Sequence, residues 1–472
     1  MLDKVLSKSE PVLDQINFGL CEDSPSHPHE KVKTKKVHLV SLGCARNLVD
    51  SEVMIGTLLN RSWEKTLVPK EADAVIINTC GFIEAAKEES IDTILRFAAL
   101  KKENPDFHLV VTGCLTQRYK KQLALGLPEV DFFLGTDEFS RIAELLDNPP
   151  PHGSVFARRT HYLYNEALPR VNTLSPYSAY VKVAEGCGHS CSFCIIPAIR
   201  GKLRSRPISS VVTEVQKLAS QGCVEINLIA QDLAAYGRDR GQDELLPLLE
   251  QLVLVDGIRW IRMLYVYPEN ISDELLDFFA HQEKIVKYID IPVQHASDRI
   301  LKSMNRALSK SEMKAVIRRV REKVPGVAIR TTVMVGFPGE TDADFEDLKE
   351  FVTEMQFEHL GCFTYSQEEG TVAGRMKDQV DEKVKLARQA SLMMIQKEIS
   401  AKRMSSFLGQ VHQALVLGPS RDNPYVWEAR LPTQAPEVDG LIYIHDGAVK
   451  AGCIQAIEIQ KTSDYDLVGS VH

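Results

Sequence analysis

The sequence lacks any long apolar run. No window approaches the ~18 uninterrupted apolar residues that a membrane-spanning helix needs, so no transmembrane segment is expected. The first ten residues carry Asp3, Lys4 and Lys8 and have no apolar core, which argues against a secretory signal peptide. The sequence therefore predicts a cytoplasmic protein with no membrane partner.

An excess of positive charge is missing too. Lysine and arginine number 56 against 64 aspartate and glutamate residues, which gives a net charge of −8. Proteins that hold nucleic acid mainly by neutralising phosphates are usually basic, so any such binding would have to be local. The hydrophobic fraction of 44% and the charged fraction of 25% are those of a globular chain, and 472 residues suggest about three domains.

Cysteine, by contrast, is plentiful, with ten residues. Disulfides are rare in reducing compartments, and domains of this size bury enough surface to fold without them. Metal binding or redox chemistry is therefore the better explanation for the cysteines.

The N-terminal part divides into a tail, a domain and a linker. Residues 1–35 are polar and are expected to form a flexible extension, with Cys21 as an isolated thiol. Residues 36–148 alternate short apolar runs with helical patterns such as 83–100, which predicts a doubly wound α/β domain with a parallel sheet. Three consecutive prolines then open a linker over 149–176.

Three of the apolar runs in the first domain end in a cysteine, namely Cys44, Cys80 and Cys114. Parallel strands end at one edge of their sheet, and that edge is where open α/β sheets bind ligands. We therefore expect the three thiols to converge there, although cysteine is also common in buried strands for purely structural reasons.

Residues 177–402 alternate six strand candidates with helical patterns. Six β/α units are too few for a closed eightfold barrel and predict an open, partial one. The candidates are Tyr180–Glu185, Glu225–Gln231, Trp260–Tyr267, Tyr288–Val293, Ala328–Gly336 and His359–Tyr365. In the fourth helical pattern, Ser309 and Glu312 fit a capping box, and Pro325-Gly326 ends the helix.

Residues 403–472 hold short β-rich runs broken by glycine and proline, which predicts a small antiparallel barrel. The runs are Val411–Leu417, Tyr425–Arg430, Leu441–His445 and Cys453–Ile459. This block carries five basic and eight acidic residues, or −3, which argues against specific tRNA binding.

The strongest local motif is Cys187-Gly-His-Ser-Cys191-Ser-Phe-Cys194, directly after the first strand of the second domain. One loop can wrap three thiolates around an iron–sulfur cluster, and a 4Fe-4S cube with three protein ligands keeps one iron open. The alternatives are a zinc site, for which His189 is poorly placed as a fourth ligand, or incidental core cysteines.

This motif after the first strand of a β/α barrel resembles the radical S-adenosylmethionine (SAM) superfamily. The resemblance implies that the open iron binds the amino and carboxylate groups of SAM. One electron then cleaves the sulfonium bond and yields a 5′-deoxyadenosyl radical, which can take hydrogen from unactivated carbon. Beside such a loop, Cys44, Cys80 and Cys114 are best interpreted as ligands of a second 4Fe-4S cluster.

Together the two triads resemble the methylthiotransferase family over residues 36–472. The family order is an N-terminal domain with an auxiliary cluster, a radical-SAM barrel and a C-terminal TRAM barrel. The resemblance implies that SAM serves both as methyl donor and as radical source, and that a reductase or a flavodoxin-like protein supplies electrons.

Shorter motifs are similar to the RimO branch rather than the MiaB branch, which usually has Gly-Cys-Gln-Met-Asn where this chain has Gly-Cys-Ala-Arg-Asn. These motifs are Ser41-Leu-Gly-Cys-Ala-Arg-Asn-Leu-Val-Asp-Ser-Glu52, Thr79-Cys-Gly-Phe-Ile83, Tyr265-Val-Tyr-Pro268, Val293-Gln-His-Ala-Ser297, Ala435-Pro-Glu-Val-Asp-Gly440 and Asp464-Tyr-Asp-Leu-Val-Gly469. The branch implies methylthiolation of the β-carbon of an aspartate in a small-subunit ribosomal protein, free or on the ribosome. The alternative is a tRNA adenosine methylthiotransferase of the MiaB type.

Four residues are candidates for contacts with SAM. Gly336 and Gly339 lie in a segment that resembles the motif near the SAM adenine, and the same segment could simply be a turn that caps the next helix. Gln231 and Arg262, on the second and third strands, are also expected to contact SAM. His295 ends the fourth strand, where a structural hydrogen bond and a catalytic role both remain open.

The remaining cysteines, Cys223, Cys362 and Cys453, have no partner at ligand spacing. They are expected to be core or incidental residues.

Overall fold

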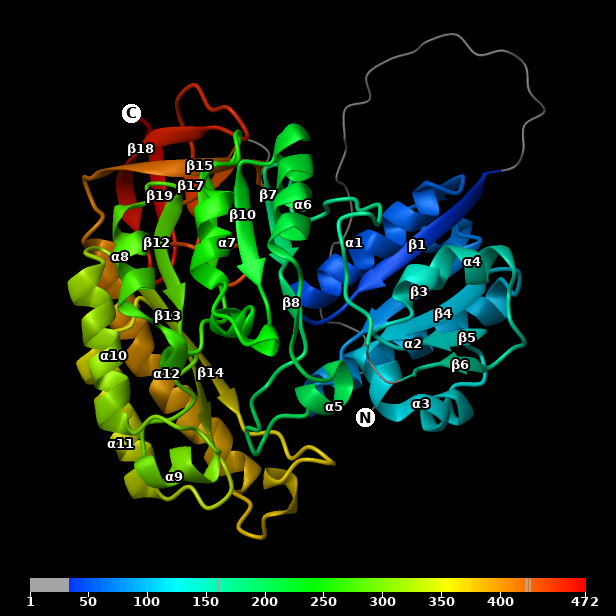
Figure 1. The fold of residues 1–472 in the computed structure, drawn as a ribbon, viewed down its shortest axis with the longest axis horizontal. Helices are drawn as coiled ribbons and strands as arrows, with labels where there is room; N and C mark the ends of the chain where they lie inside the picture. Colours follow the sequence, from blue (N-terminus) through cyan, green and yellow to red (C-terminus); the bar gives the residue numbers. More distant parts are fainter. Residues whose placement is uncertain (1–33, 159–160, 421–422, 424–425) are drawn as a thin grey trace.

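The computed structural model describes residues 34–158, 161–420, 423 and 426–472. Residues 1–33 of the predicted extension, which include Cys21, therefore lie outside the described residues. The described chain forms an N-terminal α/β domain, a central sheet with its helices and a C-terminal barrel (Figure 1). None of the described helices combines the length and apolarity needed to cross a membrane.

The N-terminal domain is built on six parallel strands in the order β2-β1-β3-β4-β5-β6. The strands are β1 (Lys35–Ser41), β2 (Trp63–Lys65), β3 (Ala74–Thr79), β4 (His108–Gly113), β5 (Phe132–Leu134) and β6 (Ser154–Phe156). The strand order reverses between β1 and β3, and a crevice opens beyond the carboxyl ends of strands at such a switch point. The predicted doubly wound parallel sheet is thus confirmed.

Strand β6 lies inside the segment predicted as a linker over 149–176. The proline run is followed by a turn at Gly153, where φ is 74°, and the chain then returns to pair with β5. The proline run thus marks a turn at the edge of the sheet, and the sheet continues beyond the predicted boundary.

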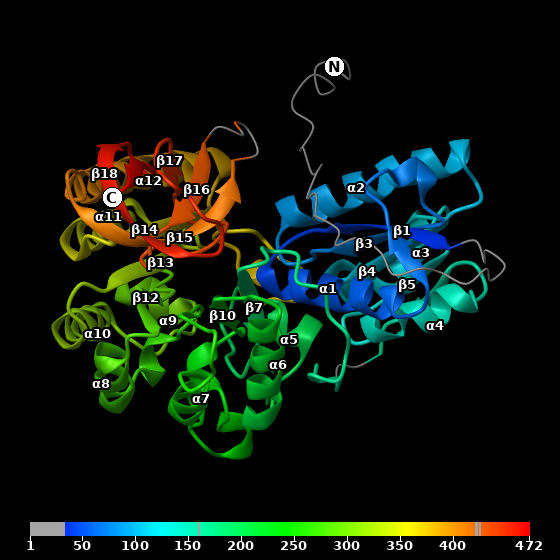
Figure 2. The same cartoon turned by 90° about the horizontal axis from the view of Figure 1, so that it is seen from above.

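Helices cover both faces of this sheet (Figure 2). They are α1 (Ala45–Leu59) and α4 (Ile142–Asp147) on one face, and α2 (Glu84–Glu103) and α3 (Cys114–Gly126) on the other. Every residue of β3 is buried, as expected for a parallel strand that is covered on both sides.

The central domain holds six parallel strands in the order β14-β13-β12-β11-β10-β7, and the sheet stays open. The strands are β7 (Ser178–Lys182), β10 (Glu225–Ile229), β11 (Trp260–Met263), β12 (Ile285–Asp290), β13 (Ala328–Val335) and β14 (His359–Thr364), with a small pair β8 (Ala184–Glu185) and β9 (Arg204–Ser205). All six strand candidates are present, so the predicted partial barrel is confirmed.

The helices of this domain are α5 (Ile196–Arg200), α6 (Ile208–Ser220), α7 (Leu245–Leu252), α8 (Asp273–His281), α9 (Asp298–Ser303), α10 (Lys310–Lys323), α11 (Asp342–Met355) and α12 (Glu382–Ser405). The predicted capping box of Ser309 and Glu312 begins α10. The outer face of the sheet packs on α6, α7, α8, α10 and α11 in one large apolar core.

The C-terminal domain is a closed barrel in the order β15-β16-β17-β19-β18. Its strands are β15 (Val411–Pro419), β16 (Trp427–Arg430), β17 (Ile442–Ile444), β18 (Ile454–Thr462) and β19 (Leu467–Val471). The sequence predicted four of these strands and missed β19, where Gly469 interrupts the apolar pattern. Tyr425, the first residue of one predicted run, lies outside the described residues.

The barrel packs against the inner side of the central sheet. Tyr180 on β7 donates a hydrogen bond to Glu437 at 3.1 Å, and Tyr288 on β12 donates one to Asp439 at 2.7 Å. Glu225 on β10 lies between Arg262 on β11, at 3.0 Å, and Arg430 of the barrel. All three side chains of this charged triad, Glu225, Arg262 and Arg430, are almost completely buried.

This triad yields a stability prediction. Burial raises the pKa of Glu225, but the charges of Arg430 and Arg262 outweigh this effect and lower the pKa to about 2. Its contribution to stability is therefore fully present above the unfolded pKa of about 4.3 and is lost as the pH falls towards 2. Glu225→Gln leaves two buried arginines without their carboxylate and should cost about 3–5 kcal/mol.

Thermal unfolding at neutral pH, followed by calorimetry, measures this loss. The exposed Glu250 offers a matched control, because Glu250→Gln on α7 should leave the unfolding temperature unchanged. An equal unfolding temperature for Glu225→Gln and the wild type would contradict the role of the triad.

Candidate functional site

Three cysteines lie at the carboxyl edge of the N-terminal sheet. Cys44 follows β1 and caps α1, Cys80 directly follows β3, and Cys114 begins α3 after β4. Gly43 adopts a φ of 94°, and a Cβ atom at this position would lie 2.9 Å from Cβ of Cys80. Only glycine therefore allows the loop of Cys44 to approach Cys80 this closely.

These thiols affect each other's pKa values. Burial raises the pKa of Cys80 to about 12, and the charge of Cys114 adds to this effect. Burial also raises the pKa of Cys114. Burial has the same effect on Cys44, but Arg46, Arg200 and the first backbone N–H groups of α1 outweigh it, so the pKa of Cys44 is lowered. The three thiols thus form one electrostatic group.

The second group of thiols lies on the loop after β8. The backbone N–H of Cys187 donates to the carbonyl of Gly201 at 3.1 Å, and that of Cys194 donates to the carbonyl of Cys191 at 3.1 Å. Burial raises the pKa of Cys187, and it raises that of Cys194 to about 12. One backbone hydrogen bond within the loop and one to the end of α5 thus hold the loop in place.

An aromatic clamp holds this loop from one side. The rings of His189 and Tyr267 are stacked with centroids 3.8 Å apart, and Nε2 of His189 lies 2.7 Å from the carboxylate of Asp232. The guanidinium of Arg306 lies 4.0 Å from the ring centroid of Tyr267, and it donates to Sγ of Cys191 at 3.9 Å. His189 is thus bound to an aspartate instead of facing the thiols.

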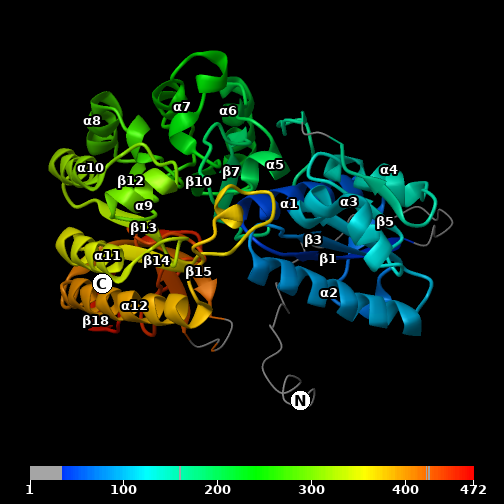
Figure 3. The same ribbon diagram turned by 90° about the horizontal axis from the view of Figure 1, so that it is seen from below.

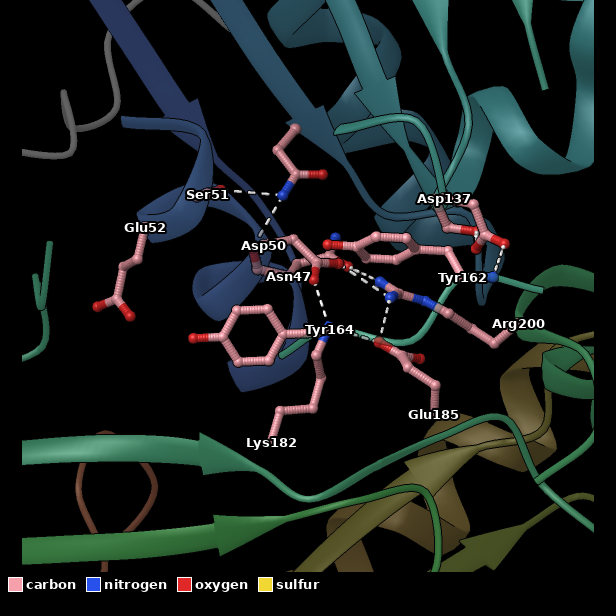
Figure 4. Close-up of polar contacts among 12 residues, drawn as sticks. Asn47, Asp50, Ser51, Glu52, Asp137, Tyr162, Tyr164, Lys182, Glu185 and Arg200 are labelled. Atoms are coloured by element: carbon pink, nitrogen blue, oxygen red, sulfur yellow. Dashed lines mark hydrogen bonds and ion pairs between the residues drawn. The ribbon is translucent and has the colours of Figure 1, made fainter. Parts of the chain in front are cut away.

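A buried ion network joins the N-terminal and central domains (Figure 4). Nζ of Lys182, on β7, lies 2.5 Å from both Asp50 on α1 and Glu185. Arg200, the last residue of α5, contacts the same two carboxylates at 2.9 and 3.2 Å. We call these four residues the interdomain network, and each of their side chains is at most 6% exposed.

Arg200 extends the network to the first group of thiols. It donates to Oδ1 of Asn47 at 2.6 Å and to Sγ of Cys114 at 3.5 Å. Asn47 in turn donates to the carbonyls of Leu42 and Thr79, both at 3.0 Å. Figure 3 shows α5 beside α1 and α3, and Cys114 packs with Ile195 and Ile199. A residue of the central domain thus reaches the thiols of the N-terminal domain.

Ion pairs flank the network on both sides. Arg170 contacts Glu52 of α1 and Glu214 of α6, each at 2.6 Å. Glu368, in the segment after β14, contacts Arg118 of α3 at 2.6 Å and Lys87 of α2 at 3.1 Å. The two domains are therefore held together by charged side chains at three places.

The residues predicted to contact SAM differ in their surroundings. Gln231 lies just beyond β10, with Nε2 3.4 Å from Glu185, and its buried Oε1 has no hydrogen-bond partner among the described residues. A buried acceptor without a partner fits a ligand that supplies a donor. Arg262 contradicts the prediction, because it is fully buried against Glu225 and Pro432 at the barrel contact.

Gly336 and Gly339 form a turn with φ values of 75° and 79°. The N–H of Gly336 donates to Glu340 at 2.7 Å, and Thr341 caps α11, so the turn does cap the next helix. His295 makes a structural contact, since its Nδ1 accepts from the N–H of Ser297 at 3.0 Å.

Neither triad has the geometry of a single-ion site. Within the described residues, no group of three or more His, Cys, Asp or Glu side chains is close enough to hold one metal ion. A tetrahedral zinc ion binds sulfur at about 2.3 Å and so draws its ligands close together. A multi-iron cluster binds each thiolate through a different iron, so its thiols need not converge on one point. The donor set of each triad, three thiols, fits such a cluster.

The sequence motifs pointed to both triads but not to the interdomain network. Asp50 is part of the quoted motif after β1, but several polar residues of α1 are buried beside it, and nothing in the sequence singled it out. No motif contained the functional pattern of Lys182, Glu185 and Arg200. The one sequence signal was their position, since each lies at the end of a strand or helix that flanks the cysteine loop.

Comparisons with known proteins agree with this architecture. Family models match at residues 36–135 (uncharacterized protein family UPF0004), 181–352 (radical SAM superfamily) and 408–471 (TRAM domain). The radical SAM methyltransferase TsrM from Kitasatospora setae, solved with cobalamin and a 4Fe-4S cluster, superposes with a TM-score of 0.52. It is 15% identical, with 72% of this chain and 77% of that chain covered, so the likeness concerns the fold alone.

Whole-length relatives are much more similar. The ribosomal protein uS12 methylthiotransferase RimO of Geobacter sulfurreducens is 46% identical over 93% of this chain and 98% of its own length. The protein of the same name from Syntrophotalea carbinolica is 46% identical over 94% of this chain and 98% of its own. With this identity over nearly the whole length, and with the two cysteine triads on a radical-SAM architecture, the chain belongs to the RimO family of radical SAM methylthiotransferases.

Proposed function

We propose that this enzyme methylthiolates the β-carbon of an aspartate residue in ribosomal protein uS12. The observation that carries the proposal is that two cysteine triads, one in each domain, lie on either side of a single charged domain junction. A sulfur donor and a radical source must both reach one substrate carbon, and this arrangement suits that requirement. The names of the relatives supply the substrate class.

We infer that Cys187, Cys191 and Cys194 hold a 4Fe-4S cluster with one open iron for SAM. Cys44, Cys80 and Cys114 would hold a second 4Fe-4S cluster that serves the sulfur transfer. When bound, these groups supply methyl transfer and a radical able to take hydrogen from carbon. Gln231, Gly336 and Gly339 are the proposed SAM contacts, the first through its unpartnered Oε1.

The chain's own side chains keep the junction closed to water. The interdomain network neutralises its own charges, with two cations against two carboxylates. Although burial raises the pKa of Glu185, Lys182 and Arg200 lower it to about 2, so the carboxylate stays ionised and paired. A closed junction protects a carbon radical from quenching by solvent and oxidants.

Partners and location follow from the substrate. A ribosomal protein is usually basic, and the charge of −3 on residues 403–472 suits such a partner better than tRNA. We infer a cytoplasmic enzyme that meets uS12 free or on the ribosome and receives electrons from a reductase or a flavodoxin-like protein. A tRNA adenosine substrate is the alternative that the experiments below exclude or select.

Metal analysis tests the two clusters. Anaerobically purified protein should contain about eight iron atoms per chain, because two 4Fe-4S clusters supply four each. Replacing all of Cys44, Cys80 and Cys114 with alanine should halve the iron to about four. Stoichiometric zinc in place of iron would overturn the cluster assignment.

Single cysteine variants separate the two roles. Cys191→Ala should abolish SAM cleavage, measured as 5′-deoxyadenosine, because the two remaining thiols would not retain the cluster whose open iron would bind SAM. Cys80→Ala should abolish methylthio transfer while some SAM cleavage persists. Cys453→Ala, at a half-buried position on the C-terminal barrel, is the matched control and should behave as the wild type. Full transfer activity in Cys80→Ala would contradict the second cluster.

Mass spectrometry tests the substrate. Small-subunit proteins from cells without this gene should lack one methylthio group on one aspartate of uS12, and reintroducing the gene should restore it. The tRNA nucleosides of the same cells serve as the internal control and should not change. If cells without the gene lack the methylthio group on their tRNA while uS12 is the same as in cells with the gene, the tRNA alternative is selected.

A further inference from the structure

Arg46 spans the junction between the two domains. It is the second residue of α1, two positions after Cys44. Its Nη1 donates to the carbonyl of Ala230, directly beyond β10, at 2.8 Å. Its guanidinium carbon lies 4.8 Å from the ring centroid of Tyr265, shortly beyond β11. An arginine of the N-terminal domain is therefore held at the carboxyl edge of the central sheet, where the SAM-binding loop also lies.

The charge of Arg46 acts on both triads. Burial raises the pKa of Cys187 and of Cys194, and Arg46 partly offsets that effect in each. In the other triad, Arg46 is the largest influence that lowers the pKa of Cys44. Because Arg46 follows Cys44 by two residues and its guanidinium contacts Ala230 beyond β10, it lies between the proposed sulfur donor and the proposed radical source.

No carboxylate pairs with this guanidinium. Within the described part of the chain, Nη1 is the one guanidinium nitrogen of Arg46 that donates a hydrogen bond, and the guanidinium forms no ion pair. Glu185 acts on Arg46 electrostatically, but its carboxylate is already bound by Lys182 and Arg200. Arg46 is only partly exposed, and a partly buried cation without a counter-ion favours binding of an anion.

The residue beneath Arg46 is strained. Tyr265 adopts a φ of 59°, a left-handed conformation that is rare for a bulky aromatic residue and unfavourable in free energy. Asp290 holds this conformation by accepting from the N–H of Tyr265 at 3.1 Å, and Arg330 holds Asp290 at 3.2 Å. Such strain persists where the surroundings fix it, and here it keeps an aromatic face under the guanidinium.

We propose that Arg46 binds the side-chain carboxylate of the substrate aspartate and so holds its β-carbon between the two cysteine triads. The inference rests on the proposed function and adds the residue that recognises the substrate. The reacting carbon is bonded directly to the carboxylate carbon, so fixing the carboxylate by a charge-assisted contact also fixes the C–H bond to be broken. A neutral nucleobase would give a cation at this place no such partner.

Two other roles for Arg46 predict different results. If Arg46 were a counter-ion to a cluster, replacing it would change the binding of the aspartate and asparagine forms of uS12 equally. As a ligand for the carboxylate of SAM, it would affect SAM binding without any ribosomal protein. The experiment must therefore vary the substrate carboxylate and the arginine together.

The test is a double-mutant cycle on the reconstituted holoenzyme under anaerobic conditions. The wild type and Arg46→Met are each titrated with purified uS12 and with uS12 whose target aspartate is replaced by asparagine, and dissociation constants are measured by calorimetry. Arg46→Lys keeps the charge and provides a second variant. Arg319→Met, which removes an arginine that also donates to a backbone carbonyl but lies on α10, is the matched control.

Each single change should weaken binding about tenfold, and the double change should weaken it no further, because both remove the same contact. Arg46→Lys should still prefer aspartate over asparagine, and Arg319→Met should bind both forms as the wild type does. If Arg46→Met weakens the binding of the aspartate and asparagine forms of uS12 equally, the inference is overturned and the proposed function still stands. A loss of SAM affinity in the absence of uS12 assigns the carboxylate to SAM and overturns it as well.

Failure of the proposed function is distinguishable from these results. If the wild-type holoenzyme neither binds nor modifies uS12, the substrate assignment falls, and the role of Arg46 falls with it. If Arg46→Met loads too little cluster to be titrated, the cycle is run with Arg46→Gln, which also removes the positive charge. Loss of the discrimination between aspartate and asparagine would then support the inference only if Arg319→Met retains it, and an unchanged discrimination would overturn it.

Discussion

The buried pairing of Lys182 and Arg200 with Asp50 and Glu185 sets the geometry on which the rest of the structure depends. Charges removed from water are tolerated only when they are paired, and removing one partner leaves an uncompensated charge at a cost of several kcal/mol. Because Asp50 belongs to one domain and the other three residues to the next, the pairing requires the domains to meet in one orientation. Apolar packing alone is less directional and would tolerate sliding.

The open central sheet explains why three domains are needed. A six-stranded sheet leaves an inner face that a closed barrel would fill with its own side chains. The C-terminal barrel covers one part of this face through Tyr180, Tyr288 and Glu225, and α1 of the N-terminal domain covers another near β7. Each neighbouring domain thus completes the central one, and the chemical groups gather where the covering elements meet.

Much of this could be predicted from the sequence, because local rules decide it. Cys44, Cys80 and Cys114 follow strands, and strands in a parallel sheet end at one edge, so their convergence followed from topology alone. The capping box at Ser309 is likewise a matter of spacing along one helix.

What the sequence did not reveal depends on which face of a strand a side chain occupies and how deep it lies. Arg262 is on the expected strand, but its side chain joins Glu225 at the barrel contact. Lys182 and Glu185 resemble ordinary charged residues near a strand end, and their burial appears only when α1 is packed against β7. The role of Arg46 also needs a long-range contact, since Ala230 lies far along the chain.

The short helix α5 has a consequence for both groups of thiols. It follows the cysteine loop with only Ile195 between Cys194 and its first residue, and it ends in Arg200, which touches Cys114. A change in the conformation of this loop would move α5 and withdraw Arg200 from the thiol of Cys114 in the other domain. The order of the cysteine loop and the surroundings of Cys114 are therefore coupled through one short helix.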